Sequence, residues 1–244
     1  SPISPLLSNI MLHELDMEME RQGLCFVRYA DDFSIYCKTK NEARRIGNQI
    51  YHYLRDKLKL PINRGKSGIR RPVNFNILGY GFVPIYQQGV KGKYQLVVDK
   101  ERWRSLKRKL KEATRKTRPM SFGERVQEIK QIQRGWINNF RLANMQGKLL
   151  ELDGWLRNRL RYCIWHHWKK RERKRKNLIR LGVNPEDVFR WSRSRLGGWA
   201  IAQSPILNTT ITVKRLEKRG YESLMTWYKR VAPDKFTPTL FPIV

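Results

Sequence analysis

Acidic residues and cysteines are scarce in this sequence, and long apolar runs are missing. The 244 residues include 21 Asp and Glu and three cysteines, which are Cys25, Cys37 and Cys163. Their scattered spacing argues against a disulfide framework and against a zinc module, so an intracellular, reducing compartment fits best. No stretch of about 18 apolar residues could span a bilayer, and no signal peptide is recognised. The sequence therefore does not have the pattern of a secreted or membrane-embedded protein.

Basic residues are abundant and predict a polyanionic partner. The 51 Lys and Arg give a formal net charge of +30, which is far more than solubility requires. Each phosphate that a basic side chain neutralises releases condensed counterions, so affinity for nucleic acid should fall steeply as the salt concentration rises. An anionic membrane surface is the alternative partner for such a charge.

Two adjacent aspartates lie between two short β-forming runs. Residues 25–28 and 33–37 flank Tyr29-Ala30-Asp31-Asp32, which predicts a hairpin with both carboxylates at its tip. Nucleotidyl transfer needs two hard cations roughly 3.5–4 Å apart, and oxygen ligands hold such ions best. Two carboxylates in a cleft raise each other's pKa, and a bound divalent cation removes that cost. The pair predicts a metal site, and a solvated turn is the alternative.

The first 86 residues mix helix and strand signals. Ser4 as N-cap and Pro5 at the first helical position predict one helix, and a capping box of Thr39 and Glu42 predicts a second. The apolar, glycine-interrupted segment 75–82 predicts a strand or tight hairpin. The acidic side chains of the first helix are expected to be exposed to solvent; they are Glu14, Asp16, Glu18 and Glu20.

Basic amphipathic helices dominate from Asp99 onward. The helix that begins at Asp99 should pack through one side and meet phosphate with its basic side. A capping box of Ser121 and Glu124 begins the next helix. Another runs from about Lys148 into the basic segment 169–176, for which a solvated helix end is the alternative to RNA contact. Tryptophans beside this segment favour irregular RNA, whose splayed bases can stack on aromatic rings.

Other aromatic residues leave more than one interpretation open. Trp136 and Trp155 are expected to pack in a core. Segment 191–199 predicts a loop that faces nucleic acid, followed by one helix over residues 214–230. A helical cap on the preceding domain is the alternative for the whole of residues 182–244.

Six motifs follow one another in the order found in group II intron reverse transcriptases and maturases, and residues 1 to about 230 resemble that family. The resemblance implies an α+β fold. It consists of a partial reverse-transcriptase palm of antiparallel strands with helices over residues 1–86, an all-helical thumb over 87–147 and a basic helical maturase domain over 148–244. The six motifs are residues 1–10, 28–32, 63–67, 75–82, 134–141 and 152–161.

The resemblance also implies an activity and partners. The protein would be an RNA-directed DNA polymerase and maturase that binds group II intron RNA to assist splicing and mobility. Its partners would be the intron RNA, an RNA template with a DNA primer or target, and dNTPs, with two Mg²⁺ ions as cofactors and no membrane. It would act in the cytoplasm of a bacterium, or in an organelle, and whether it forms a homodimer stays open. The alternative is an RNA-binding splicing factor with a vestigial polymerase domain.

Residue roles follow from the same motifs. Asp31 and Asp32 would be catalytic metal ligands, and Lys66 would help to protonate the departing pyrophosphate unless it is only a surface charge. The primer grip would contain Leu78, Gly79 and Tyr80. The dNTP pocket would contain Ser1, Pro2, Ser4, Pro5 and Asn9. RNA binding would fall to Arg157, Arg159, Arg161, Lys169, Lys170, Arg171, Arg173, Lys174, Arg175 and Lys176.

The sequence departs from the family in one respect that concerns the metal site. The family's enzymes complete the site with a third carboxylate from a palm strand that would precede residue 1. We therefore expect this polypeptide alone to have little or no polymerase activity, although its parent protein would have it. Paired cysteines of a zinc-bearing endonuclease are also missing, so DNA cleavage is not expected.

Overall fold

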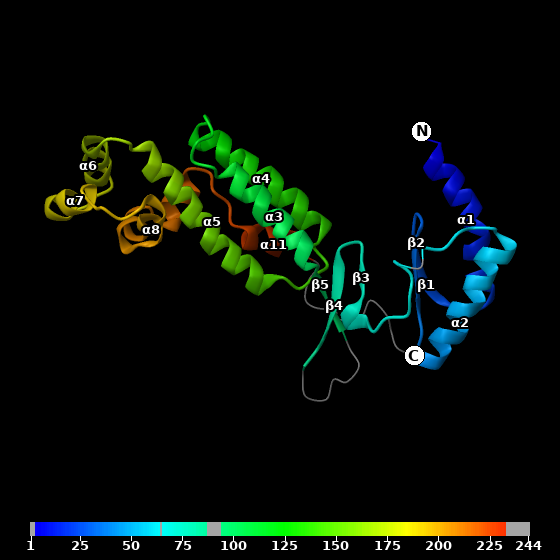
Figure 1. Ribbon diagram of the computed structural model, residues 1–244. Helices are drawn as coiled ribbons and strands as arrows, with labels where there is room; N and C mark the ends of the chain where they lie inside the picture. Colours follow the sequence, from blue (N-terminus) through cyan, green and yellow to red (C-terminus); the bar gives the residue numbers. More distant parts are fainter. Residues whose placement is uncertain (1–2, 64, 87–93, 233–244) are drawn as a thin grey trace. The chain divides into compact units, whose positions relative to one another are not determined.

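The fold is α+β and divides into two compact units. The computed structural model describes residues 3–63, 65–86 and 94–232. The first unit spans Ser1–Arg71 and the second spans Pro72–Val244. Both contain a small antiparallel sheet, and most of the helices belong to the second unit (Figure 1). None of the helices within the described ranges is long and apolar enough to cross a membrane.

In the first unit, two helices and a hairpin share a small core. The elements in chain order are α1 (Ser4–Arg21), β1 (Cys25–Tyr29), β2 (Asp32–Tyr36), α2 (Lys40–His52) and a π-helical turn (Tyr53–Lys57). Buried side chains from the helices and the π-helical turn form this core, against which one face of the hairpin packs; they are Leu15, Met19, Ile46, Ile50 and Leu54.

The sequence-based predictions for the hairpin and the second helix are confirmed, and the start of the first helix is shifted by one residue. The predicted hairpin forms, and the Thr39 side chain and Glu42 make a reciprocal capping box at the start of α2. Ser4, however, is the first residue of α1 and not its cap, because the cap position falls on Ile3 and no side chain bonds to the free amides there. A shift of one residue at a helix end is common, since the end residues are only half in the helix.

The second unit begins with a three-stranded antiparallel sheet in the order β3-β4-β5. A short 3-10 turn (Pro72–Asn74) precedes β3 (Asn76–Ile77), β4 (Tyr80–Pro84) and β5 (Tyr94–Val98). The predicted tight hairpin within residues 75–82 is thus confirmed, with Leu78 and Gly79 as its turn. β5 was not among the predicted elements, and it adds a third strand beside β4.

A helical bundle follows the sheet and encloses the larger core. It starts with α3 (Lys100–Ala113), α4 (Phe122–Asn139) and α5 (Gln146–His167), and continues with α6 (Arg171–Arg180), α7 (Pro185–Ser192), α8 (Gly198–Gln203), α9 (Pro205–Thr210), α10 (Val213–Lys218) and α11 (Leu224–Val231). In Figure 1, α3, α4 and α5 lie side by side. Fully buried side chains of these three helices include Leu106, Leu110, Ile129, Ile137, Leu149, Leu156 and Leu160.

Three expectations about the later helices need correction. The long helix ends at His167, and α6 is a separate helix that carries most of the basic segment, although no Gly or Pro marks the break. The single helix expected over 214–230 is two helices, because Gly220 between α10 and α11 has a left-handed φ of +93°. Segment 191–199 is a loop only over residues 193–197, since α7 and α8 include its ends.

A buried carboxylate joins α11 to α5. Asp153 accepts hydrogen bonds from the Tyr221 hydroxyl at 2.8 Å and from the backbone amides of Leu224 and Met225 at 2.8 and 3.1 Å. It thereby satisfies free amides at the start of α11, where a negative charge is favourable. Burial, together with the charge of Asp153, raises the pKa of Tyr221 well above its usual value. This contact explains on structural grounds why an aspartate occurs in the 152–161 motif.

Candidate active site and nucleic-acid interface

The tip of the first hairpin is a two-residue turn that presents Asp31 and Asp32. Tyr29 pairs with Asp32, so Ala30 and Asp31 form the turn. Ala30 has a φ of +55°, a left-handed conformation that costs an L-residue about 1–3 kcal/mol. The surrounding contacts must therefore hold Ala30 in place. Backbone strain of this kind is often found at functional sites.

Arg28 supplies those contacts. Its Nε and Nη2 donate to the two carboxylate oxygens of Asp16 on α1 at 2.7 and 2.5 Å, and its Nη1 donates to the Ala30 carbonyl at 2.8 Å. The Arg28 and Asp16 side chains are only 14% and 19% exposed. Hydrogen bonding to Asp16 raises the pKa of Arg28, which stays charged. Asp16 is thus not the solvated side chain expected from the sequence, because it anchors the arginine that fixes the turn.

The carboxylates of Asp31 and Asp32 remain available to a ligand. Both residues are exposed, and neither side chain has a hydrogen bond or ion pair to another residue in the ranges that the structure describes. Their oxygens are hard, acceptor-only ligands of the kind that Mg²⁺ prefers. Within the same ranges, no group of three or more His, Cys, Asp or Glu residues is arranged to hold a metal. The pair fits a divalent ion in charge and chemistry and supplies part of a ligand set.

The other residues expected near this site have different surroundings. Asn9 accepts a hydrogen bond from Arg28 through its Oδ1 at 3.0 Å, which links it to the hairpin tip. Ser4 and Pro5 are exposed on the first turn of α1, whereas Ser1 and Pro2 lie outside the described residues. The backbone amide of Lys66 donates to the Asn63 carbonyl at 3.1 Å, and its side chain is exposed. No contact between described residues brings Lys66 to the aspartates.

The turn expected to grip a primer lies in the second unit. Leu78 and Gly79 both have left-handed φ angles, +52° and +85°, as in the type I′ turns that favour tight hairpins. A Cβ at Gly79 would lie 2.9 Å from the Arg102 Nε and 3.1 Å from the Phe140 ring. The Tyr80 hydroxyl donates to the Asn139 carbonyl at 2.7 Å, and burial raises the pKa of Tyr80. The turn is therefore held against α3 and α4, with Leu78 about half exposed at its tip.

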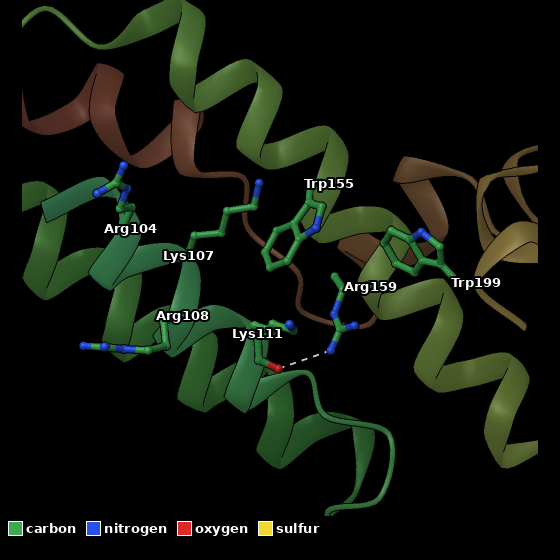
Figure 2. A pocket seen from close by; sticks show the side chains of 7 residues that line it. All are labelled: Arg104, Lys107, Arg108, Lys111, Trp155, Arg159 and Trp199. Carbon is green, nitrogen blue, oxygen red and sulfur yellow. Dashed lines mark hydrogen bonds between the residues drawn. The ribbon is translucent and has the colours of Figure 1, made fainter. Parts of the chain in front are cut away.

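An open basic groove of about 580 Å³ lies between α3, α5 and α8. Trp155 of α5 and Trp199 of α8 line it, and Arg159 lies between their indole rings (Figure 2). The Lys107 Nζ is 5.4 Å from the centre of the Trp155 ring. The α3 side chains in the groove are all basic: Arg104, Lys107, Arg108 and Lys111.

The sequence indicates only part of this groove. The basic side of α3 and Arg159 were expected to meet nucleic acid, and Trp155 does pack against the core as expected, but it also lines the groove. Trp199 falls within segment 191–199, which was expected to face nucleic acid as a loop, but its position on α8 beside Trp155 was not expected. The sequence feature that could have indicated this aromatic cluster is the spacing of Trp155, Arg159 and Tyr162. These residues lie on one side of α5, because residues three and four apart are neighbours on a helix.

The remaining basic residues expected to bind RNA fall into three groups, which are buried, half-buried and exposed. Arg161 is 6% exposed and donates to the Ile211 carbonyl, and burial lowers its pKa, so its guanidinium supports the fold. Lys174 and Arg175 are half-buried over the rings of Trp165 and Phe189. Burial lowers the pKa of Lys174. Arg157 is also half-buried, whereas the others are exposed to solvent, namely Lys169, Lys170, Arg171, Arg173 and Lys176.

Comparisons with known protein families agree with this arrangement. Residues 1–82 match the family model described as reverse transcriptase (RNA-dependent DNA polymerase), so the hairpin and its helices are of the reverse-transcriptase class. Residues 103–182 match the group II intron, maturase-specific domain. With both matches in this order, the chain belongs to the group II intron reverse transcriptases and maturases. A comparison with curated protein sequences found no match.

The family defines a general activity. Its members are RNA-directed DNA polymerases that function in group II intron splicing, and they act on RNA and other nucleic-acid substrates. Reverse transcriptases use divalent metal ions. The roles of individual residues are a separate question.

Proposed function

We propose that Asp31 and Asp32 hold divalent metal ions, Mg²⁺ in the cell, during RNA-directed DNA synthesis. The observation that carries this proposal is the hairpin tip, where a charged arginine fixes a strained turn and two adjacent carboxylates have no hydrogen-bond or ion-pair partner among the described residues. Bound ions would activate the primer hydroxyl and neutralise charge on the departing pyrophosphate. Arg28 acts as a positioning residue, since its bonds go to Asp16, to the Ala30 carbonyl and to the Asn9 side chain, and none goes to a reacting atom.

Other residues of the chain have supporting roles in this proposal. The Asn9 side chain accepts from Arg28, and its amide NH₂, which donates to no other described residue, is proposed to donate to an incoming dNTP, beside Ser4 and Pro5 on the first turn of α1. The exposed Lys66 ammonium provides a proton to the pyrophosphate. The anchored turn Leu78-Gly79-Tyr80 supports the primer strand.

We also propose that the isolated chain has little polymerase activity. In the described ranges, no third His, Cys, Asp or Glu side chain is grouped with Asp31 and Asp32 to hold a metal, and two adjacent carboxylates by themselves would hold ions loosely. In a primer-extension assay with Mg²⁺, an RNA template and a DNA primer, we expect this chain to make little or no product. Robust synthesis would overturn this part of the proposal and leave the metal assignment intact.

The second unit binds RNA through its basic helices. Group II intron RNA is the proposed partner, together with an RNA template paired to a DNA primer, in the cytoplasm. The formal charge of +30 supports this partner, as do the exposed basic residues on α3 and α6. Because binding releases counterions, the logarithm of RNA affinity should fall linearly with the logarithm of salt concentration.

Mn²⁺ in place of Mg²⁺ tests the metal assignment without requiring synthesis. Paramagnetic Mn²⁺ should broaden NMR signals from the hairpin tip in the unmodified chain. The double substitution Asp31→Asn and Asp32→Asn should abolish that broadening, and Glu20→Gln should preserve it, since Glu20 is an exposed acidic residue on α1. Equal broadening in all three proteins would overturn the assignment. Loss of RNA binding in the double variant would show that the two functions are not separate.

A further inference from the structure

We propose that the groove between α3, α5 and α8 binds unpaired nucleotides of RNA, with a base against the two indoles and phosphates along α3. This inference rests on the proposed RNA binding of the second unit and specifies the form of RNA that one site accepts. The aromatic side of the groove, its basic side and its rigidity each contribute to the argument.

The aromatic side surrounds one guanidinium. The Arg159 Cζ lies 5.9 Å from the centre of the Trp155 ring, 5.7 Å from that of Tyr162 and 5.8 Å from that of Trp199. Both indoles are half-buried and border the open groove. A nucleobase offers a flat π-face, and aromatic and guanidinium planes are the groups on which unpaired bases stack. The two indoles that line the groove and the guanidinium therefore suit a base that has left its helix.

Arg159 is fixed before any ligand arrives. Its Nε donates to the Thr114 hydroxyl at 3.0 Å, and its Nη2 donates to the carbonyls of Lys111 and Thr114 at 3.2 and 2.8 Å. The Nη1 has no hydrogen-bond partner among the residues that the structure describes. The guanidinium therefore keeps a donor for a phosphate or a base edge, and little side-chain entropy is lost on binding.

The basic side is one face of α3. Arg104, Lys107, Arg108 and Lys111 are exposed and repeat at helical spacing, which extends about 10 Å along the helix. An ion pair to Glu101 occupies Arg104, whereas the other three have no acidic partner in the described ranges. In Figure 2, Lys107 reaches toward Trp155, while Arg104 and Arg108 point away from the indoles. A nucleic-acid backbone can thus follow α3 while one base turns toward the rings.

The groove favours unpaired over paired RNA. In a duplex the bases stack on one another and their faces are hidden, so a double helix offers phosphates to α3 and nothing to the indoles. The volume of about 580 Å³ lies within the range of roughly 300–1,000 Å³ typical of small-ligand sites. Helices form the groove on three sides, so a base would enter a largely preformed site.

The test compares an unstructured RNA of twelve nucleotides with a duplex of the same length, by fluorescence anisotropy at fixed salt. The substitutions Trp155→Leu and Trp199→Leu keep an apolar side chain and remove the large aromatic face. Each should weaken binding of the unpaired RNA by about tenfold, because stacking contributes on that scale per base, and leave duplex binding unchanged. Trp199→Phe should restore most of the loss. Trp227→Leu is the matched control, since Trp227 is half-buried on α11 away from the groove.

A second measurement uses the unmodified protein, so that it does not depend on the folding of a variant. An RNA with abasic nucleotides keeps its phosphates and loses its bases, and it should bind about tenfold more weakly than the intact strand. The Trp199→Leu protein should hardly distinguish the two strands. The inference is overturned if the unmodified protein binds both strands equally, or if the tryptophan variants weaken duplex binding as much as single-strand binding. If the protein binds neither form of RNA, the proposed RNA binding itself is wrong.

Discussion

Arg28 and Asp16 form a two-point ion pair, with Nε–Oδ1 and Nη2–Oδ2 distances of 2.7 and 2.5 Å. The pair joins the hairpin to α1 across twelve positions of sequence. A planar guanidinium matches the two oxygens of a carboxylate, and a lysine does not. The pair therefore holds the turn in both position and orientation.

Substitution of Arg28 by lysine should destabilise the first unit. Arg28→Lys keeps the charge, but it loses the second bond to Asp16 and the bonds to Asn9 and the Ala30 carbonyl. We expect the free energy of unfolding to fall by about 1–3 kcal/mol, measured by urea denaturation. Arg21→Lys is the control and should have a much smaller effect, because the Arg21 side chain is 72% exposed. Equal losses in the two variants would contradict the importance of the pair.

Two glycine substitutions should have opposite effects in the second unit. Gly79→Ala forces a left-handed residue to carry a Cβ within 3.1 Å of Arg102 and Phe140, so we expect a loss of about 1–3 kcal/mol. Gly135→Ala lies within α4, where a Cβ meets nothing within 4 Å, so we expect a gain of about 0.5–1 kcal/mol. Thermal unfolding of both variants measures the difference. A stable Gly79→Ala protein would contradict the close packing of this turn.

Removal of the Asp153 carboxylate should loosen the start of α11, which this side chain joins to α5. Asp153→Ala leaves two backbone amides and the Tyr221 hydroxyl without their acceptor, at a cost of about 2–4 kcal/mol. Tyr221→Phe removes one of the three bonds and should cost about 1 kcal/mol. Amide hydrogen exchange at Leu224 and Met225 should accelerate strongly in the first variant and little in the second. Unchanged exchange in Asp153→Ala would mean that other contacts hold the start of α11.

Acid should destabilise the second unit partly through His166. Burial, and then the nearby Lys116, His167 and Lys169, lower the pKa of His166 below its usual value of 6.5. The folded chain therefore binds fewer protons at this position than the unfolded chain does. Its contribution to stability is fully present above pH 6.5 and is lost as the pH falls through the folded pKa. His166→Gln should reduce the loss of stability between pH 7.5 and pH 5, measured by urea denaturation, and an unchanged pH dependence would exclude this role.

Local signals in the sequence predicted much of the fold. The capping boxes at Thr39 and Ser121 correctly indicated where α2 and α4 begin, because a capping box involves residues only three positions apart. The hairpin of Asp31 and Asp32 was equally clear, since its strands are adjacent in the chain.

Interactions between distant residues were not predictable in the same way. The partner of Asp16 is twelve residues away, and that of Asp153 about seventy. No local pattern distinguishes such a carboxylate from a solvated one. The groove combines α3, α5 and α8, so the sequence could place Trp199 in a segment that faces nucleic acid but could not place it beside Trp155 and Arg159. Asp31 and Asp32 differ from these carboxylates, because their sequence motif alone was enough to single them out. Their role as metal ligands remains a proposal.

The two contacts of Arg159, with the end of α3 and with the groove, restrict which residue can stand at position 159. Its bonds to the carbonyls of Lys111 and Thr114 lie at the C-terminal end of α3, where the helix dipole is negative and carbonyls lack partners. The same side chain lies between the indoles of the groove. A substitution that improved contact with a ligand but gave up these carbonyls would fray the helix that carries the basic face. Arginine alone among the natural side chains has enough donors for both tasks, so a library randomised at position 159 and selected for folding and RNA binding together should return arginine.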